Sequence, residues 1–331
     1  MQVRLEEISG QTLPYARAQK TLGSFATVED RTTFGHVSKF AFCLEDKATI
    51  EGLLIATFPS WVYYLRRSAA MAGRDRTVEK LPFVRRRIHY DVCVSTQVGC
   101  AVNCPFCASS LLPFLRNLTL EEMLAQIETL RRELPPRARL QRIYYSGIGE
   151  PLLNDEAVIE TARYLLARHY IPSTINTSGI VPAMEKIMSQ RLPVNLIVSI
   201  HAPNNALRRK LVPITDAYPL EDIVRVLRGA PRWMFIETKY LLLEDINDSE
   251  DHANELADLL DRLNVVVTLQ SYNRIPERDF EKSSPHRVRA FANTLRRRGF
   301  TVGFLNSNIG EPVGGGCGQM RMNSSSASRL R

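Results

Sequence analysis

Three cysteines lie close together in the segment VGCAVNCPFC, residues 98–107. Cys100, Cys104 and Cys107 follow the spacing C-x3-C-x2-C, in a chain of 331 residues that contains only six cysteines. Thiolates grouped on one loop bind zinc or an iron–sulfur cluster. Structural zinc usually takes four ligands, often from two C-x2-C pairs, and the sequence has no second pair.

A fourth ligand for these cysteines is not evident. His89 and His169 are the nearest histidines, and neither is adjacent to the cysteine segment. An iron–sulfur cubane held by three cysteines instead leaves one iron open for a small molecule. Phe106 precedes the last cysteine, where its ring would shield a cluster from water. The residues favour such a cluster, and zinc or coincidental thiols are the alternatives.

The elements that must position this loop form a strand–helix alternation that starts at Asp91. Thr119 and Glu122 form a T-x-x-E capping box, which predicts a helix from there to about Leu134. Strands are expected near 91–95, 142–146, 171–177, 194–202, 233–243, 265–272 and 300–305. Further helices are expected near 155–168, 182–190, 219–228, 248–263 and 285–298. About six β/α units predict a parallel sheet in a partial (β/α)6 TIM-like barrel, with its chemistry at the strands' carboxyl ends.

The regions that flank this barrel have different patterns. Residues 39–58 alternate apolar and polar residues on both sides of Glu45-Asp46-Lys47, which predicts a β-hairpin. Residues 59–90 form a basic insertion, and the serine-rich tail after Gln319 is typical of disorder. We therefore expect an N-terminal extension over 1–90, a barrel over 91–305, and a C-terminal loop and tail over 306–331.

The composition is that of a water-soluble globular protein, with 44% hydrophobic and 24% charged residues. No apolar stretch is long enough for a membrane span, and the N-terminus has no secretory signal pattern. These features predict a cytoplasmic protein. The net charge of +8, with arginine runs such as Arg208-Arg209-Lys210, would attract a phosphate backbone, although solvated helix faces give the same composition.

The cysteine spacing, with an aromatic residue before the last cysteine, resembles that of radical S-adenosylmethionine (SAM) enzymes. In that superfamily the open iron of a [4Fe–4S] cluster binds the amino and carboxylate groups of SAM. One electron then cleaves the sulfonium and yields a 5′-deoxyadenosyl radical. The resemblance thus implies that Cys100, Cys104 and Cys107 need no fourth protein ligand.

Further segments resemble one branch of the superfamily, the RlmN/Cfr family of radical-SAM adenine C-methyltransferases acting on RNA. The matching segments are CVSTQVGC (93–100), RNLTLEEMLAQI (116–127), GIGEPLLN (147–154), NTSGIVP (176–182), SIHAPNNALRRKLVPI (199–214), INDSEDHANELADLL (246–260), YNRIPERDF (272–280) and GGCGQM (315–320). Together the matches run from about residue 37 to 320. CVSTQVGC combined with a distant CGQ is the most specific of them.

The family's mechanism implies roles for two cysteines outside the cluster. Cys317 matches the cysteine that one SAM methylates on sulfur, and the radical from a second SAM then removes a hydrogen from that methyl. The resulting carbon radical adds to adenine, because an aromatic carbon of adenine is a poor nucleophile for polar methyl transfer. Cys93 matches the cysteine that resolves the adduct, with a Cys93–Cys317 disulfide formed on release. Without the resemblance, Cys93 is a small strand residue and Cys317 a free thiol on a flexible tail.

The resemblance also implies a SAM-binding site. Gly149 and Glu150 match the edge that binds the methionine amino group, and Asn176 stands where the family usually has serine. The other implied SAM-binding residues are Ser199, Ile200, His201 and Asn273. Alternatively, His201 is a structural histidine at a strand end, with its hydrogen bonds made within the protein.

A glutamate matches the family's proton acceptor. Glu51 in TIEGLL is the preferred match, because the preceding KFAFCLED also fits, and Glu79 in TVEKLP competes with it. On its own, Glu51 is equally an exposed strand residue. Cys43 is expected in the core.

The chain departs from the family pattern where the substrate is recognised. Only about 36 residues precede the matching hairpin, and LNSNIGEPVGGG replaces the usual arginine and aspartates before Cys317. The resemblance implies a monomer that acts on rRNA or tRNA and takes electrons from a donor such as flavodoxin. The alternatives are the same relay on a small molecule, and a non-catalytic RNA-binding factor that keeps a cluster.

Overall fold

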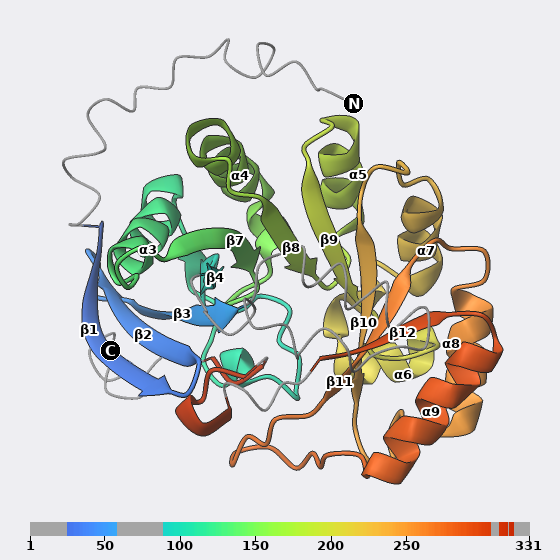
Figure 1. Ribbon diagram of the computed structural model, residues 1–331. Coiled ribbons are helices and arrows are strands. Elements are labelled where there is room, and N and C mark those ends of the chain that lie inside the picture. Colours follow the sequence, from blue (N-terminus) through green and yellow to red (C-terminus); the bar gives the residue numbers. More distant parts are fainter. Residues whose placement is uncertain (1–24, 58–88, 306–310, 317, 321–331) are drawn as a thin grey trace.

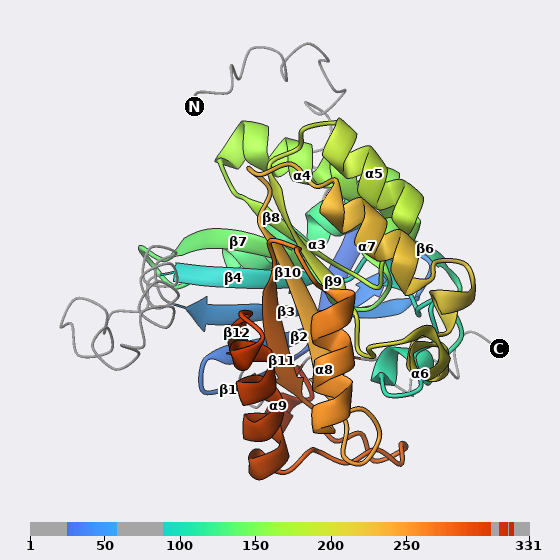
Figure 2. The same cartoon turned by 90° about the vertical axis from the view of Figure 1, so that its right-hand side faces the viewer.

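One curved sheet of ten strands organises the molecule (Figure 1). A computed structural model describes residues 25–57, 89–305, 311–316 and 318–320. The strands are hydrogen-bonded in the order β1-β2-β3-β4-β7-β8-β9-β10-β11-β12, and β5 and β6 form a separate two-stranded ladder. The helices lie on the outer side of the curved sheet in Figures 1 and 2. The sheet has two ends, β1 and β12, so the architecture is the predicted partial barrel.

The N-terminal part of this sheet is antiparallel. Its strands are β1 (Ala26–Phe34), β2 (Val37–Leu44) and β3 (Thr49–Thr57). The ladder between β2 and β3 confirms the hairpin predicted over 39–58. Strand β1 was not expected, because all of its residues except Ala26 are exposed and leave little apolar pattern.

The remaining strands of the large sheet are parallel, and a helix follows most of them. The strands are β4 (His89–Val94), β7 (Arg139–Tyr145), β8 (Ser173–Thr177), β9 (Val194–Ser199), β10 (Ile236–Leu242), β11 (Val266–Ser271) and β12 (Thr301–Leu305). The helices are α3 (Leu120–Arg132), α4 (Asp155–His169), α5 (Val181–Ser189), α6 (Asn205–Leu211), α7 (Leu220–Arg228), α8 (Glu250–Leu259) and α9 (Pro285–Arg297). The short ladder consists of β5 (Gln97–Val98) and β6 (Arg116–Asn117).

Every strand and helix predicted from residue 91 onward is present. Thr119 and Glu122 make both hydrogen bonds of the predicted capping box at the start of α3. Helix α6 was missed, since its sequence NALRRKL has only two apolar side chains beyond alanine. None of the helices in the described ranges is long and apolar enough to cross a membrane.

Strand β3 pairs antiparallel with β4, so the large sheet continues across the predicted boundary at residue 90. The division into 1–90, 91–305 and 306–331 stays a prediction. Residues 59–88 of the predicted basic insertion, with Glu79, lie outside the described residues, whereas His89 and Tyr90 belong to β4. The predicted disordered tail from residue 321 onward also lies outside the described residues, whereas Met320 is buried.

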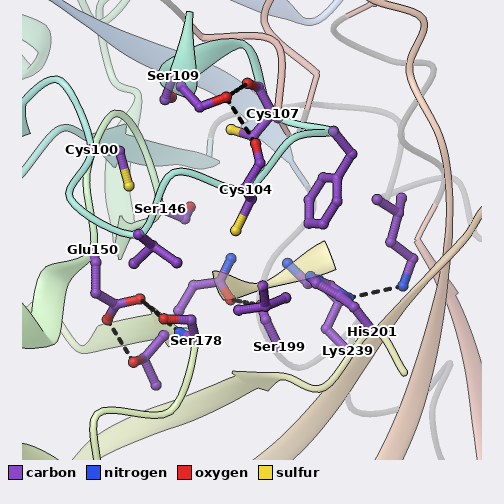
Figure 3. Close-up of a pocket in the computed structure, with 18 of the residues that line it drawn as sticks. Cys100, Cys104, Cys107, Ser109, Ser146, Glu150, Ser178, Ser199, His201 and Lys239 are labelled. Carbon is purple, nitrogen blue, oxygen red and sulfur yellow. Dashed lines mark hydrogen bonds between the residues drawn. The ribbon is translucent and has the colours of Figure 1, made fainter. Parts of the chain in front are cut away.

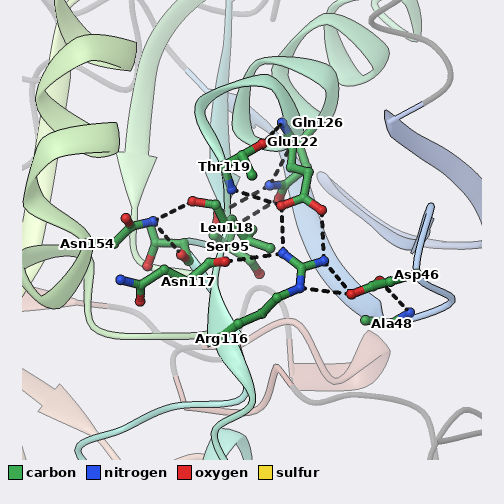
Figure 4. Close-up of polar contacts among 11 residues, drawn as sticks. Asp46, Ala48, Ser95, Arg116, Asn117, Leu118, Thr119, Glu122, Gln126 and Asn154 are labelled. Atoms are coloured by element: carbon green, nitrogen blue, oxygen red, sulfur yellow. Dashed lines mark hydrogen bonds and ion pairs between the residues drawn. The ribbon is translucent and has the colours of Figure 1, made fainter.

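An arginine connects the N-terminal hairpin to the rest of the sheet (Figure 4). The Arg116 guanidinium donates to both carboxylate oxygens of Glu122 at 2.8 Å and to Asp46 in the β2–β3 turn at 2.8 Å. These two carboxylates raise the pKa of Arg116. Bidentate, charge-assisted hydrogen bonds of this kind are the stronger ones in proteins. The contact therefore fixes the start of α3 and the β6 segment against the hairpin.

The first glycine of GIGEP lies where two backbones approach closely. A Cβ on Gly147 would lie 2.7 Å from the backbone of Val94 and Ser95. Gly147 N also donates to Val94 O at 2.9 Å, so the end of β4 and the loop after β7 are held together. Since backbone atoms cannot move aside as a flexible side chain can, this position requires glycine.

We expect Gly147→Ala to lower the free energy of unfolding by about 1–3 kcal/mol, as overpacking does elsewhere. Gly229→Ala is the matched control, because a Cβ there meets nothing closer than 3.6 Å. Urea denaturation followed by circular dichroism measures both variants. Equal stability of the two variants would contradict the backbone contact at Gly147.

Candidate functional site

A single pocket at the carboxyl ends of the parallel strands gathers most of the sequence-predicted site residues (Figure 3). It lies between the cysteine loop and the ends of β7 to β11. The predicted residues that line it are Cys100, Cys104, Cys107, Gly149, Glu150, Asn176, Ser199 and His201. Residues that follow different strands and are up to about a hundred positions apart in sequence therefore share one cavity.

The three cysteines of the loop approach the pocket from one side. Burial raises the pKa of Cys100 to about 12, and burial also raises the pKa of Cys104. Such thiols stay protonated until a metal replaces the proton. Within the described ranges, no three His, Cys, Asp or Glu side chains converge as ligands of a single metal ion.

The loop itself is fixed by its own hydrogen bonds. Ser110 Oγ donates to the carbonyls of Cys104 and Cys107, at 2.8 and 2.7 Å. The ring of Phe106 packs edge-on against the His201 ring at a centroid distance of 5.3 Å. Phe106 is thus buried between the cysteine loop and His201, and its role as a shield for the cluster stays a prediction.

The carboxylate of Glu150 is the most completely hydrogen-bonded group in the pocket. Its Oε1 accepts from Leu152 N at 3.0 Å and from Thr177 Oγ1 at 2.5 Å. Its Oε2 accepts from the N–H and the hydroxyl of Ser178, both at 2.7 Å. Burial raises the pKa of Glu150, and these donors act against that shift. Because all its lone pairs are engaged, Glu150 orients the loop after β8 and gives this wall of the pocket its negative charge.

Arg208 lies at the base of the same wall, although its place in an arginine run predicted an exposed, phosphate-attracting residue. That prediction was wrong, because the side chain is completely buried. Nε donates to Ile200 O at 3.1 Å, and one terminal nitrogen donates to the carbonyls of Ser178 and Ser199. Burial lowers the pKa of Arg208 to about 10, and the nearby Cys104 and Glu150 oppose the shift.

His201 is held in a strained position beside the cysteine loop. Its φ is +59°, in the left-handed region that side chains other than glycine rarely adopt. Its Nδ1 accepts from Leu241 N at 3.0 Å, and its carbonyl accepts from Asn247 Nδ2 at 2.8 Å. Burial and the charges of Arg208 and Lys239 lower the pKa of His201 to about 3. The imidazole therefore lines the pocket as a neutral group whose Nδ1 is already satisfied.

The other predicted SAM-binding residues have different environments. Ser199 Oγ donates to Asn176 Oδ1 at 3.3 Å, so the asparagine does engage the neighbouring strand. Ile200 is 1% exposed and contributes its backbone, which donates to Lys239 O and accepts from Arg208. Asn273 is buried after β11, and a Cβ on Gly316 would lie 2.4 Å from its Nδ2.

Cys93 and Glu51 lie on the neighbouring strands β4 and β3. Cys93 Sγ is 3.2 Å from Ser146 Oγ, and Ser146 lines the pocket. Glu51 is 1% exposed, so the interpretation as an exposed strand residue is wrong. Lys39 Nζ donates to Glu51 Oε1 at 2.9 Å. Cys43, expected in the core, is only half-buried.

Cys317 lies outside the described residues, whereas its neighbours on both sides are described. Gly318 O accepts from Ala108 N at 2.7 Å, and Met320 O accepts from Ser109 Oγ at 2.8 Å. Both Gly318 and Met320 line the pocket. The C-terminal segment therefore packs against the cysteine loop, more than 200 residues away in sequence.

Sequence reasoning missed Arg208, Ser178 and Lys239. Ser178 follows Thr177 at the end of β8 and adds two of the four bonds to Glu150. Lys239 had a detectable sequence signal. It alternates with Glu237 in IETKYLL, although a central parallel strand is normally apolar on both faces. Charges at every second position of such a strand indicate an inner face that meets a polar cavity.

Comparisons with known proteins relate the chain to one superfamily. A family model described as the radical SAM superfamily matches residues 94–232. A protein of Vesicomyosocius okutanii named dual-specificity RNA methyltransferase RlmN is 36% identical over 260 residues, which cover 75% of this chain and 72% of the relative. A protein of Syntrophobacter fumaroxidans with the same name is 34% identical over 86% of this chain and 76% of its own.

A solved structure extends the similarity to the whole fold. The crystal structure of a radical SAM methyltransferase from Sphaerobacter thermophilus covers 96% of this chain and 88% of its own, with a TM-score of 0.77 and 29% sequence identity. The similarity therefore includes the N-terminal strands as well as the residues around the cysteine loop.

We expect Arg208→Lys to lower the free energy of unfolding by about 2 kcal/mol, because an ammonium cannot satisfy the carbonyls that the guanidinium fork reaches. The adjacent Arg209→Lys, whose guanidinium meets exposed Asp216, is the control and should change stability by less than about 0.5 kcal/mol. Urea denaturation measures both. An equal effect of the two substitutions would show that the carbonyl contacts of Arg208 contribute nothing.

Proposed function

The chain belongs to the RlmN family of radical SAM methyltransferases, and from this premise we propose that it methylates a carbon of adenine in ribosomal or transfer RNA through a methyl group carried on Cys317. One observation carries the proposal. Directly after Cys317, Gly318 O accepts from Ala108 N and Met320 O accepts from Ser109 Oγ, so this segment is hydrogen-bonded to the end of the cysteine loop. A methyl-carrying thiol needs such proximity to the SAM site.

Cys100, Cys104 and Cys107 would hold a [4Fe–4S] cluster. When bound, the cluster supplies the electron that cleaves SAM to a carbon-centred radical. Phe106 limits the access of water to the loop, and Glu150 holds the strand end that faces the methionine amino group. Ser199, Asn176 and Asn273 contribute polar groups around the remainder of the cosubstrate, with the neutral His201 beside them.

Cys317 has two tasks in the proposed reaction. Its thiolate attacks the methyl of a first SAM, so that an S–CH3 bond forms and S-adenosylhomocysteine leaves. A second SAM then provides the radical that removes one hydrogen from this methyl, and the remaining carbon forms the new bond to adenine. Two molecules of SAM are therefore used in each turnover.

Cys93 and Glu51 would complete the reaction. Once the adduct radical has lost the ring proton to Glu51 and one electron, which would return to the oxidised cluster, the Cys93 thiolate attacks the Cys317 sulfur. A disulfide forms, and the carbon that leaves takes up a proton to become the product methyl. The disulfide must be reduced before the next turnover. Glu51 is the proposed proton acceptor for the adenine C–H, and its ion pair with Lys39 keeps a carboxylate in this buried position.

The relatives and the net charge both support an RNA substrate. Both named relatives are RNA methyltransferases, and the chain carries a net charge of +8, which suits a polyanion. A small-molecule acceptor is the second candidate, because LNSNIGEPVGGG replaces the family's charged run before Cys317. The flavodoxin-type donor, the monomeric state and the cytoplasmic location stay predictions.

The methyl relay predicts a modified Cys317. After anaerobic reconstitution and incubation with methyl-labelled SAM, mass spectrometry of the peptide that contains Cys317 should show one labelled methyl on its sulfur. Cys93→Ser is the control, since it should keep this methyl and block only release. An unmodified Cys317 in protein that still cleaves SAM would exclude the relay.

An RNA substrate predicts binding that depends strongly on salt. Affinity for a structured rRNA or tRNA fragment should fall by at least about tenfold between 50 and 200 mM salt, because released counterions drive binding to phosphates. Fluorescence anisotropy with a labelled RNA measures this effect. Weak, salt-independent RNA binding would favour the small-molecule acceptor.

A further inference from the structure

Lys239 is a buried cation whose role no part of the proposed reaction explains. It lies in the middle of β10, opposite Ser199 of β9, and is 6% exposed. Its neighbour Tyr240 packs on Phe291 of α9, with ring centroids 5.0 Å apart. Since side chains alternate along a strand, Lys239 points away from that helix and into the barrel. It lines the pocket there, beside His201 in Figure 3.

Lys239 differs from the other buried charges of the described residues because its ammonium has no partner among them. Glu51 pairs with Lys39, Glu122 with Arg116, and Asp248 with Arg287. Glu150 and Arg208 are each saturated with hydrogen bonds. Burying an ammonium without a partner is unfavourable, so a site of this kind is typical of a residue that binds an anionic ligand.

The charges that surround the pocket define the kind of ligand. Among the described lining residues, Lys239 is the single lysine or arginine and Glu150 the single carboxylate. His201 adds no positive charge near neutral pH, because burial keeps its pKa at about 3. Arg208 lies behind the wall and donates to backbone carbonyls. The pocket is thus lined by one carboxylate and one ammonium, which complement the ammonium and the carboxylate of a zwitterionic amino acid.

We propose that the Lys239 ammonium binds the carboxylate of the methionine moiety of SAM, while the Glu150 wall faces the amino group at the other end of that zwitterion. Ser199, opposite Lys239 on the next strand, donates its single hydroxyl hydrogen to Asn176 Oδ1, so Lys239 is the donor left for the carboxylate on this pair of strands. The inference rests on the proposed SAM site and adds to it the residue that selects for an intact amino acid. It does not depend on the methyl relay or on the identity of the acceptor.

The test compares two ligands that differ in the amino acid moiety. SAM carries the carboxylate, and 5′-methylthioadenosine keeps the nucleoside and sulfur but has neither amine nor carboxylate. Isothermal titration of the reconstituted, oxidised full chain measures both dissociation constants without turnover. We expect Lys239→Met to weaken SAM binding by at least about thirtyfold, the usual effect of removing one partner of a buried charge pair, and to leave methylthioadenosine binding unchanged.

Two further variants control for charge and for folding. Lys239→Arg should retain most of the preference for SAM, because it keeps the positive charge. Lys210→Met, on the exposed side of α6, should affect neither ligand. If Lys239→Met does not fold, Lys239→Gln and Lys239→Arg give the same comparison of a neutral with a charged side chain.

An equal loss of affinity for both ligands would overturn the proposal, because Lys239 would then only shape the pocket. Unchanged affinity for both ligands would overturn it as well. The result is separable from the methyl relay, since selective SAM binding can be lost or retained whether or not Cys317 becomes methylated.

Discussion

The rest of the site depends on a buried chain of contacts that joins Arg208 to Glu150 through one residue, Ser178. Arg208 donates to the carbonyl of Ser178, and Ser178 donates through its N–H and its hydroxyl to Glu150. A buried cation and a buried carboxylate thereby stabilise each other without direct contact. Because the same guanidinium also reaches Ile200 and Ser199, it sets how the ends of β8 and β9 face the pocket. An isolated strand end would leave these carbonyls unsatisfied, at about 1–3 kcal/mol each.

Other polar contacts attach the N-terminal hairpin and the C-terminal segment to the elements around the site. Arg116 joins the β2–β3 turn to α3, which brings the hairpin that carries Glu51 against β4 and Cys93. The bonds from Ala108 to Gly318 and from Ser109 to Met320 tie the C-terminal segment to the cysteine loop. The proposed methyl carrier, the proposed resolving cysteine and the cluster loop are thus supported by three separate parts of the chain.

Local chemistry made most of the fold predictable. The capping box at Thr119 and the turn after Glu45 are short-range patterns whose geometry depends on a few neighbouring residues. Strand β1 and helix α6 were missed for the opposite reason. An exposed edge strand and a short helix with three basic residues have little apolar periodicity, and tertiary contacts determine them.

The sequence by itself determined the cysteine spacing, the β/α alternation and the family, because these depend on residue types at fixed separations along the chain. Tertiary structure alone decided which charges are buried and what they contact. Arg208 and Arg209 are adjacent in sequence, yet one is enclosed by strand-end carbonyls and the other meets exposed Asp216. Lys239 is likewise one residue from Tyr240 and faces the opposite side of β10. Burial and partners depend on which strands come together across the sheet, and no local pattern contains that information.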